Sequence, residues 1–261
     1  KGNAEYINRL NKIKILNLIR ESGEISRVDI ANKTGISAPT ITRIVDNLIN
    51  EVKLVSQVGI GVSSGGRPPV ILKFNGEDNY IIGIDWGRTH IYGVLSNLNA
   101  KTLLKIEVLI NTEHNFKSDL DKVIEIINYL ITNSKISLSQ LRGIGVAVPG
   151  YVNKKTNKVE FSPNFKWKNV DIPSYIKAYF NVPVIVDTVA RVMAMGELWY
   201  GIGDKIKDFV FVSLGYGIGA GIVSEGLPHY GFDGFAGEFG HTTVSGSTDS
   251  QIVCECGKTN C

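Results

Sequence analysis

The sequence "YIIGIDWGRTHIYGVLSN" (residues 80–97) contains an apolar run that ends at Asp85, a turn with Gly87 and Thr89, and a second apolar run. This pattern predicts two buried strands joined by a glycine-containing turn. A second stretch, "FVFVSLGYGIGAGIVSEG" (209–226), repeats the layout about 130 residues later. The repetition predicts an α/β body with two lobes related by duplication. Each turn is able to hold phosphate on its backbone N–H groups, although glycine-rich turns are more often only structural.

The segments between these two units favour the same class. "LRGIGVAVPGYV" (141–152) predicts a buried strand that runs into a Pro-Gly turn, and "VPVIVDTVARVMAMGELWYGIG" (182–203) predicts a strand followed by a helix. A change of composition at "NGEDN" (75–79) predicts a linker. We therefore expect two domains, residues 1–76 and residues 77–261.

The first domain has the pattern of three helices, over residues 5–21, 27–33 and 38–50. Ser26 and Ser37 stand where the second and third helices need N-caps. These two short helices are joined by the turn "TGIS", which is typical of a helix-turn-helix. The third helix has an apolar stripe at helical spacing, formed by Ile41, Ile44, Val45 and Leu48.

The opposite face of the third helix is polar and indicates DNA binding. "LVSQVGIGVSSGGRPPVILKF" (54–74) predicts a hairpin, the wing of a winged helix, with Arg67 placed to reach a narrow minor groove. Residues 1–76 carry 11 Lys/Arg against 6 Asp/Glu, whereas the remainder carries 17 against 19. Together these features favour binding to double-stranded DNA over a three-helix protein-interaction domain. The residues expected to contact DNA are Ser37, Ala38, Pro39, Thr40, Thr42, Arg43, Gly66 and Arg67.

All three cysteines lie in "CECGKTNC" (254–261). No apolar run approaches the about 20 residues of a membrane span, and the amphipathic start is unlike a signal peptide, so a cytoplasmic location with reduced thiols is expected. Cys254, Cys256 and Cys261 then supply three ligands of a tetrahedral site, and His241 is able to supply the fourth. Three thiolates with one imidazole favour a structural Zn²⁺. The alternative is three reduced surface thiols.

The chain resembles the ROK family, whose name stands for repressors, open reading frames and kinases. The resemblance covers essentially the whole chain, and the winged-helix head is similar to that of the family's sugar-responsive repressors. It is carried by "GIDWGRT" (83–89), "GVAVPG" (145–150), "SPNFKW" (162–167), "SLGYGIGAGI" (213–222), "GEFGH" (237–241) and "CECGKTNC". The resemblance implies an actin-like, ribonuclease-H-like body that holds sugar in the cleft between two lobes.

The resemblance also divides the body. It implies a first lobe over about residues 80–200 and the start of a second lobe over about residues 205–261. In relatives, further strands and helices follow the cysteine motif, together with a Glu that contacts the sugar. We therefore expect the chain to be the N-terminal portion of a longer protein with an incomplete second lobe.

The residues that the resemblance assigns to sugar binding are Asn164, Glu238 and His241. In family kinases an Asn-Asp pair binds the sugar and accepts its proton, and the matching positions here are Thr188 and Val189. Because valine is unable to accept a proton, the chain is expected not to be an enzyme. Asp187 would take that role only after a two-residue register change.

The first glycine turn also departs from the kinase pattern, because Arg88 replaces a glycine that would face phosphate. We therefore expect a sugar-responsive DNA-binding regulator, a repressor of carbohydrate-utilisation genes, with a monosaccharide effector. Its operator would be a palindrome that a homodimer contacts with two heads. Two alternatives stay open: an active ATP-dependent sugar kinase with an appended DNA-binding head, and a DNA-bound scaffold without a small-molecule ligand.

Overall fold

The structure is a computed structural model that describes residues 2–61, 68–110, 115–243 and 253–261. The chain divides into two compact units, Lys1–Asn79 and Tyr80–Cys261. The boundary directly follows "NGEDN", the stretch whose composition predicts a linker.

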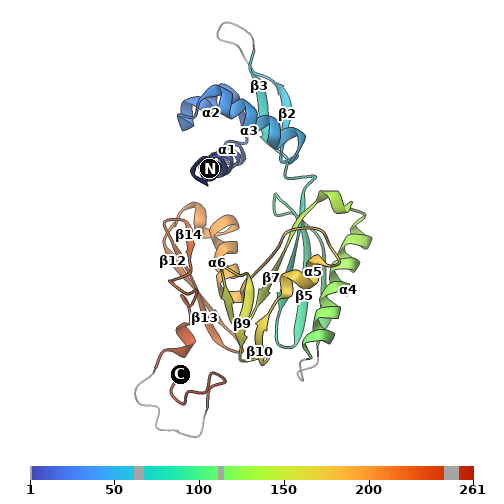
Figure 1. Cartoon of the computed structure of the whole chain (residues 1–261), viewed down its shortest axis with the longest axis vertical. Coiled ribbons are helices and arrows are strands. Elements are labelled where there is room, and N and C mark those ends of the chain that lie inside the picture. Colours follow the sequence, from blue (N-terminus) through green and yellow to red (C-terminus); the bar gives the residue numbers. More distant parts are fainter. Residues whose placement is uncertain (1, 62–67, 111–114, 244–252) are drawn as a thin grey trace. The chain divides into compact units, whose positions relative to one another are not determined.

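The first unit packs three helices on a small antiparallel sheet (Figure 1). Its elements are α1 (Gly2–Ser22), β1 (Glu24–Ser26), α2 (Arg27–Thr34), α3 (Ala38–Asn50), β2 (Val55–Ile60) and β3 (Val70–Phe74). The sheet order is β1-β3-β2. The three helices and the hairpin agree with the sequence pattern, whereas β1 was not expected. The wing tip with Gly66 and Arg67 lies outside the described residues.

Local hydrogen bonds explain where α2 begins and ends. The Ser26 hydroxyl accepts from the backbone N–H of Asp29, and the Asp29 carboxylate accepts from the backbone N–H of Ser26, which completes a capping box. Gly35, with φ 71°, ends the helix in the left-handed region that glycine adopts without strain. Ser37 occupies the N-cap of α3, but its hydroxyl pairs with that of Thr40 at 2.9 Å and makes no bond to a backbone N–H. The expected side-chain cap by Ser37 is therefore wrong.

The apolar stripe of α3 lies in the core of this unit, as its spacing predicts. Ile41, Ile44, Val45 and Leu48 are each at most 2% exposed. They pack with buried residues of the other elements, among them Ile15, Ile19, Ile25, Ile30, Val55 and Leu72. Burial of this stripe fixes which face of α3 points outward.

The second unit contains a five-stranded mixed sheet in the order β11-β7-β4-β5-β6. Its strands are β4 (Tyr80–Trp86), β5 (His90–Asn97), β6 (Thr102–Leu109), β7 (Leu141–Val148) and β11 (Val184–Thr188). β4, β5 and β6 pair antiparallel, whereas β7 pairs parallel with β4 and β11. The core between this sheet and the helices α4 (Phe116–Ser134) and α5 (Ile172–Lys177) is rich in isoleucine and valine. A short 3-10 helix, η1 (Leu138–Gln140), precedes β7.

A meander of three short strands follows β7. It consists of β8 (Tyr151–Asn153), β9 (Lys158–Ser162) and β10 (Trp167–Val170), in the order β10-β9-β8. The turn between β9 and β10 is anchored by Phe165 and Trp167, whose rings pack against the buried ring of Trp86. Part of "SPNFKW" is therefore structural.

The second strand–turn–strand unit forms a separate antiparallel sheet in the order β12-β13-β14. Its strands are β12 (Phe209–Leu214), β13 (Ile218–Ser224) and β14 (Leu227–His229). The helix α6 (Val189–Tyr200), which follows β11, packs its buried Ala194 and Leu198 on this sheet. A Cβ on Gly221 would lie 2.4 Å from the Ala190 carbonyl oxygen, so the close approach of α6 to β13 requires glycine. Two 3-10 helices, η2 (Ile202–Asp204) and η3 (Phe239–His241), complete the described elements.

Candidate functional site

The outward face of α3 is the first candidate site. Among the residues expected to contact DNA, Ser37, Ala38, Pro39, Thr42 and Arg43 are exposed and Thr40 is half-buried. They lie together at the start of the helix, opposite the buried stripe. Because no side chain caps this helix, its first N–H groups remain available to an anionic partner.

The helix α1 contributes to the same surface, which the sequence reasoning missed. Arg43 Nη2 donates to Asn8 Oδ1, and Lys12 Nζ donates to Asn47 Oδ1 at 2.6 Å. Asn8 and Lys12 line a groove with the polar face of α3. These contacts join residues 35 positions apart, so no local pattern predicts them. The only sequence signal is the basic character of the first domain.

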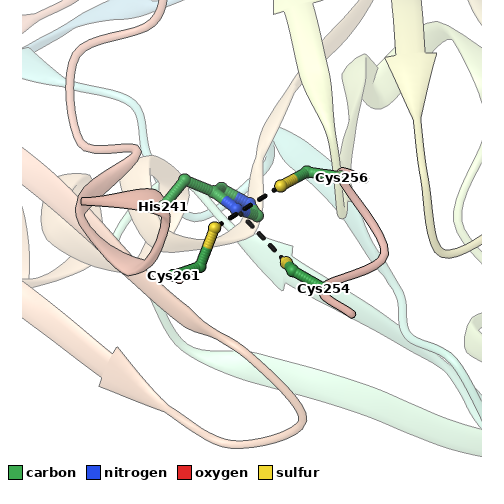
Figure 2. A group of neighbouring side chains, drawn as sticks. All are labelled: His241, Cys254, Cys256 and Cys261. Carbon is green, nitrogen blue, oxygen red and sulfur yellow. Dashed lines mark hydrogen bonds between the residues drawn. The ribbon is translucent and has the colours of Figure 1, made fainter. Parts of the chain in front are cut away.

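A group of metal-ligating side chains is the second candidate site. The donor atoms of His241, Cys254, Cys256 and Cys261 all lie within 4.8 Å of one another. His241 Nδ1 lies 3.6 Å from Cys254 Sγ, and Cys256 Sγ lies 3.5 Å from Cys261 Sγ. Figure 2 shows the three sulfur atoms gathered around the imidazole. The four residues expected to share a metal are thus brought together.

The spacing of these donors fits a single tetrahedral ion. With metal–sulfur bonds of about 2.3 Å, two sulfurs on one ion lie about 3.8 Å apart, close to the separations observed here. The pKa of the Cys256 thiol is lowered to about 7, first by the backbone N–H of Lys258, which favours the thiolate that binds metal. The pKa of Cys261 is raised to about 11, first by burial and then by the neighbouring sulfurs.

Glu238 and His241 form the third candidate site, to which the resemblance also assigns Asn164. Glu238 precedes η3, and its Oε2 lies 3.9 Å from His241 Nε2, the ring nitrogen that faces away from Cys254. Burial raises the pKa of Glu238, while the charges of His241 and Arg191 oppose that rise. The two residues therefore share one turn as expected, although that turn is a 3-10 helix.

Asn164 is half-buried in the turn between β9 and β10. In the described part of the chain, no hydrogen bond joins it to Glu238 or His241. Its assignment to the sugar remains a prediction.

The junction of β11 and α6 contains Thr188 and Val189, the two residues that the resemblance matches to the Asn-Asp pair of family kinases. Thr188 is the N-cap of α6 and Val189 is its first residue, half-buried. Asp187 accepts from the backbone N–H of Thr188 at 2.8 Å and from Arg191 Nε at 2.7 Å. The pKa of Tyr230 is raised, first by burial, then by the charge of Asp187, and also by its hydrogen bond to that carboxylate. Asp187 thus already accepts from two donors of the chain, and its charge acts on the Tyr230 hydroxyl.

The first glycine turn holds an ion pair that the sequence did not predict. Arg88 Nη1 donates to Glu255 Oε1 at 2.9 Å, and Glu255 lies between two cysteines of the metal group. The arginine therefore links the turn between β4 and β5 to the cysteine segment.

These features define a class of protein: a winged-helix head followed by an α/β body with two strand–turn–strand units and a His/Cys group. A profile described as "ROK family" matches residues 81–261, and one described as "Winged helix-turn-helix DNA-binding" matches residues 9–51. The chain belongs to the ROK family. The expected family and fold class are thereby confirmed.

A xylose repressor of Caldicellulosiruptor bescii is 36% identical over 266 residues, which cover 100% of this chain and 64% of that protein. A crystal structure of a ROK family transcriptional regulator, a homolog of the E. coli MLC protein, superposes with a TM-score of 0.83 at 26% identity, over 98% of this chain and 63% of the other. A ROK family glucokinase from Streptomyces griseus, in complex with glucose and AMPPNP, has a TM-score of 0.62 at 26% identity, over 70% of this chain and 55% of the other.

The chain thus spans about two thirds or less of the length of these relatives. Within its described residues, no helix combines the length and the apolar character needed to cross a membrane.

Proposed function

We propose that this protein is a sugar-responsive transcription regulator whose winged-helix head binds double-stranded operator DNA. The observation that carries the proposal is the pairing of an open polar face on α3 with a ROK body that has Val189 at the acceptor position. Thr40 and Arg43 would contact base edges, and Lys12 would contact phosphate. The regulator would act as a repressor of carbohydrate-utilisation genes, because one relative is a xylose repressor.

The effector in this proposal is a monosaccharide held by Glu238, His241 and Asn164. Carboxylate, imidazole and amide groups are able to bind sugar hydroxyls by hydrogen bonds. A sugar weakens DNA binding only if it binds one arrangement of the protein better than another. Two heads on a homodimer would read the two halves of a palindrome, and the protein would act in the cytoplasm.

The metal in this proposal is Zn²⁺, bound by His241, Cys254, Cys256 and Cys261. Four protein ligands leave no open position, so bound zinc would stabilise the fold of this segment and take no part in catalysis. His241 would offer Nδ1 to the ion, while Nε2 faces Glu238. A carboxylate beside the second nitrogen orients a metal-bound imidazole.

An active sugar kinase is the second candidate, because a glucokinase shares the fold of the body. The engagement of Asp187 by Arg191 and Tyr230 argues against it, since a general base must reach the substrate hydroxyl. A coupled ATP assay with a panel of monosaccharides separates the two functions. Turnover of about 1 s⁻¹ or more, typical of enzymes, would overturn the regulator proposal.

The test of the proposal begins with a thermal-shift screen of monosaccharides, with xylose first because one relative is a xylose repressor. A sugar that binds the folded chain stabilises it by mass action, by about 2.7 kcal/mol in the free energy of unfolding at a concentration of 100 times Kd. The melting temperature therefore rises. DNA binding is then measured with and without each hit. A chain that binds DNA but no sugar would be the scaffold alternative.

A further inference from the structure

The segment Tyr230–His241 carries both Glu238 and His241, yet most of it has no regular structure. Only its last three residues form η3. Its backbone lies close to β13 at two points. The Ala220 N–H donates to the Gly237 carbonyl at 2.8 Å, and a Cβ on Gly240 would lie 2.3 Å from the Ile218 carbonyl oxygen. Gly237 has φ 97°, and a Cβ there would lie 1.8 Å from the Ala220 carbonyl oxygen. The part of the segment that precedes Gly237 is held by side chains from other elements.

Arg191 of α6 supplies the most buried of these contacts. Its side chain is 2% exposed, and its Nη1 donates to the Gly234 carbonyl at 3.3 Å. Its Cζ lies 4.5 Å from the centroid of the Tyr230 ring. The opposite edge of the guanidinium donates through Nε to Asp187. One side chain therefore joins the end of β11 to two points of the segment.

Two residues around β8 hold the segment from another side. The Tyr151 ring stacks on Phe235 with centroids 3.9 Å apart, and its hydroxyl donates to the Asp233 carbonyl. Lys154 Nζ lies 3.7 Å from the Tyr230 centroid. Phe235 itself is 54% exposed, so the stack alone leaves this part of the segment open to solvent. The buried anchor is Arg191.

We infer that Arg191 is a positioning residue for the effector and metal site, and that it holds Tyr230–His241 so that Glu238 and His241 keep their orientation. The role requires a guanidinium. Its two edges donate in different directions while its Cζ lies over the Tyr230 ring, and a single ammonium group is unable to make all these contacts at once. The sugar part of this inference rests on the proposed function, whereas the order of the segment does not.

The experiment compares Arg191→Lys and Arg191→Met with wild type in the full chain. Arg191→Lys keeps a positive charge near Asp187 but loses the bond to Gly234 and the guanidinium over the Tyr230 ring. The matched control is Lys207→Met, because Lys207 Nζ also donates to a backbone carbonyl, that of Gly203 at 2.6 Å, outside the segment. Hydrogen exchange is measured across the chain. We expect amides of residues 230–241 to exchange about tenfold faster in both Arg191 variants, with the five-stranded sheet unchanged.

A second readout uses Zn²⁺ alone, by competition with a chromogenic chelator. Loss of an orienting partner typically lowers metal affinity by about 10- to 100-fold, and we expect such a loss in both Arg191 variants and none in Lys207→Met. If Arg191→Met fails to fold, the test uses Arg191→Lys and Tyr151→Phe instead. Tyr151→Phe removes only the bond to the Asp233 carbonyl, so it should give a smaller change in exchange and zinc affinity in the same direction.

Wild-type exchange and zinc affinity in Arg191→Lys would overturn the inference, because a charge alone would then suffice. Faster exchange over the whole chain would also overturn it, since Arg191 would then serve only general stability. A wild-type chain that binds no sugar would defeat the proposed function and leave the exchange result intact.

Discussion

The structure contains two arginine–aspartate pairs with almost the same distance and opposite surroundings. Arg27 and Asp46 join α2 to α3 at 2.8 Å, and their side chains are 25% and 51% exposed. Arg191 and Asp187 join α6 to β11 at 2.7 Å and are 2% and 12% exposed. The exposed pair braces two helices and leaves the face of α3 free for a partner. The buried pair engages the Asp187 carboxylate, which lies next to the position where the resemblance places the acceptor of a kinase.

The largest effect is expected from Asp187→Ala, which leaves the charge of Arg191 buried without its partner. Removing one member of a buried pair typically costs about 3–5 kcal/mol in the free energy of unfolding. Urea unfolding of the full chain measures it. The control is Asp46→Ala, which breaks the exposed pair and should cost about 0–1 kcal/mol. Equal losses in the two variants would remove the contrast between the pairs.

The next effect concerns Arg43, which lies on the exposed face of α3. Arg43→Ala should cost about 1–3 kcal/mol in binding to a duplex that the wild-type chain selects from random sequence, because a base contact is lost. Fluorescence anisotropy measures the affinity for this duplex and for a scrambled one. Lys177→Ala removes an exposed charge from α5 in the body and serves as the control. An equal loss of affinity for both duplexes would mean that Arg43 contacts phosphate and reads no base.

Lys12→Ala should weaken binding to both duplexes by a similar factor, since a phosphate contact carries no sequence information. The slope of log affinity against log salt should fall by about 1. A variant with an unchanged slope would place Lys12 away from the DNA and leave it as a support for Asn47.

The amphipathic-helix and strand patterns of the sequence predicted much of the fold, because each buried position of a helix or strand requires an apolar residue. The stripe of α3 and the apolar runs of β12 and β13 are local signals of this kind. The helix α4 has a similar signal that the sequence reasoning did not use, with buried Leu120, Val123, Ile127 and Leu130 at helical spacing. The three-residue β1 has no such signal, because its existence depends on pairing with β3, more than 40 residues away.

The candidate site divides in the same way. The metal group was predictable because three of its four ligands lie within eight residues, and thiolates carry a specific chemistry. The roles of Asn8 and Arg191 were not. Asn8 accepts from the Arg43 guanidinium 35 positions away, and Arg191 donates to the Gly234 carbonyl 43 positions away. From the sequence alone, Arg191 in an apolar helix would be assigned to the surface. Only the structure shows Asp187, Tyr230 and Gly234 around it.

A smaller, pH-dependent effect belongs to the capping box of the head. Asp29→Ala should lower stability at pH 7 by about 0.5–1 kcal/mol, discounted because Asp29 is exposed. The hydrogen bonds from Ser26 lower the pKa of Asp29 in the folded state, so the carboxylate stabilises the head above its unfolded pKa of about 3.9. The difference between wild type and variant should shrink as the pH falls through the lowered pKa. A difference that persists at pH 2 would mean that the charge has no part in it.

A third pair, Arg88 and Glu255, gives the smallest expected effect. It tests the comparison between the exposed and the buried ion pair. Its side chains are 37% and 48% exposed, so the pair resembles that of the head although it lies in the body. Arg88→Gly should change zinc affinity by less than about fivefold, the effect of an exposed pair worth about 0–1 kcal/mol. That change should disappear at 1 M salt, where the screening length is about 3 Å.

Arg88→Gly also restores the glycine at the phosphate turn, and Glu255→Gln, which breaks the pair without altering the turn, is its control. Neither variant should turn over ATP with any monosaccharide, because Asp187 is still held by Arg191 and Val189 still lacks a proton acceptor. Phosphorylation by Arg88→Gly alone would mean that the body lost its activity at the turn. The buried pair would then be compatible with catalysis, and the distinction between the two arginine–aspartate pairs would no longer account for the proposed lack of kinase activity.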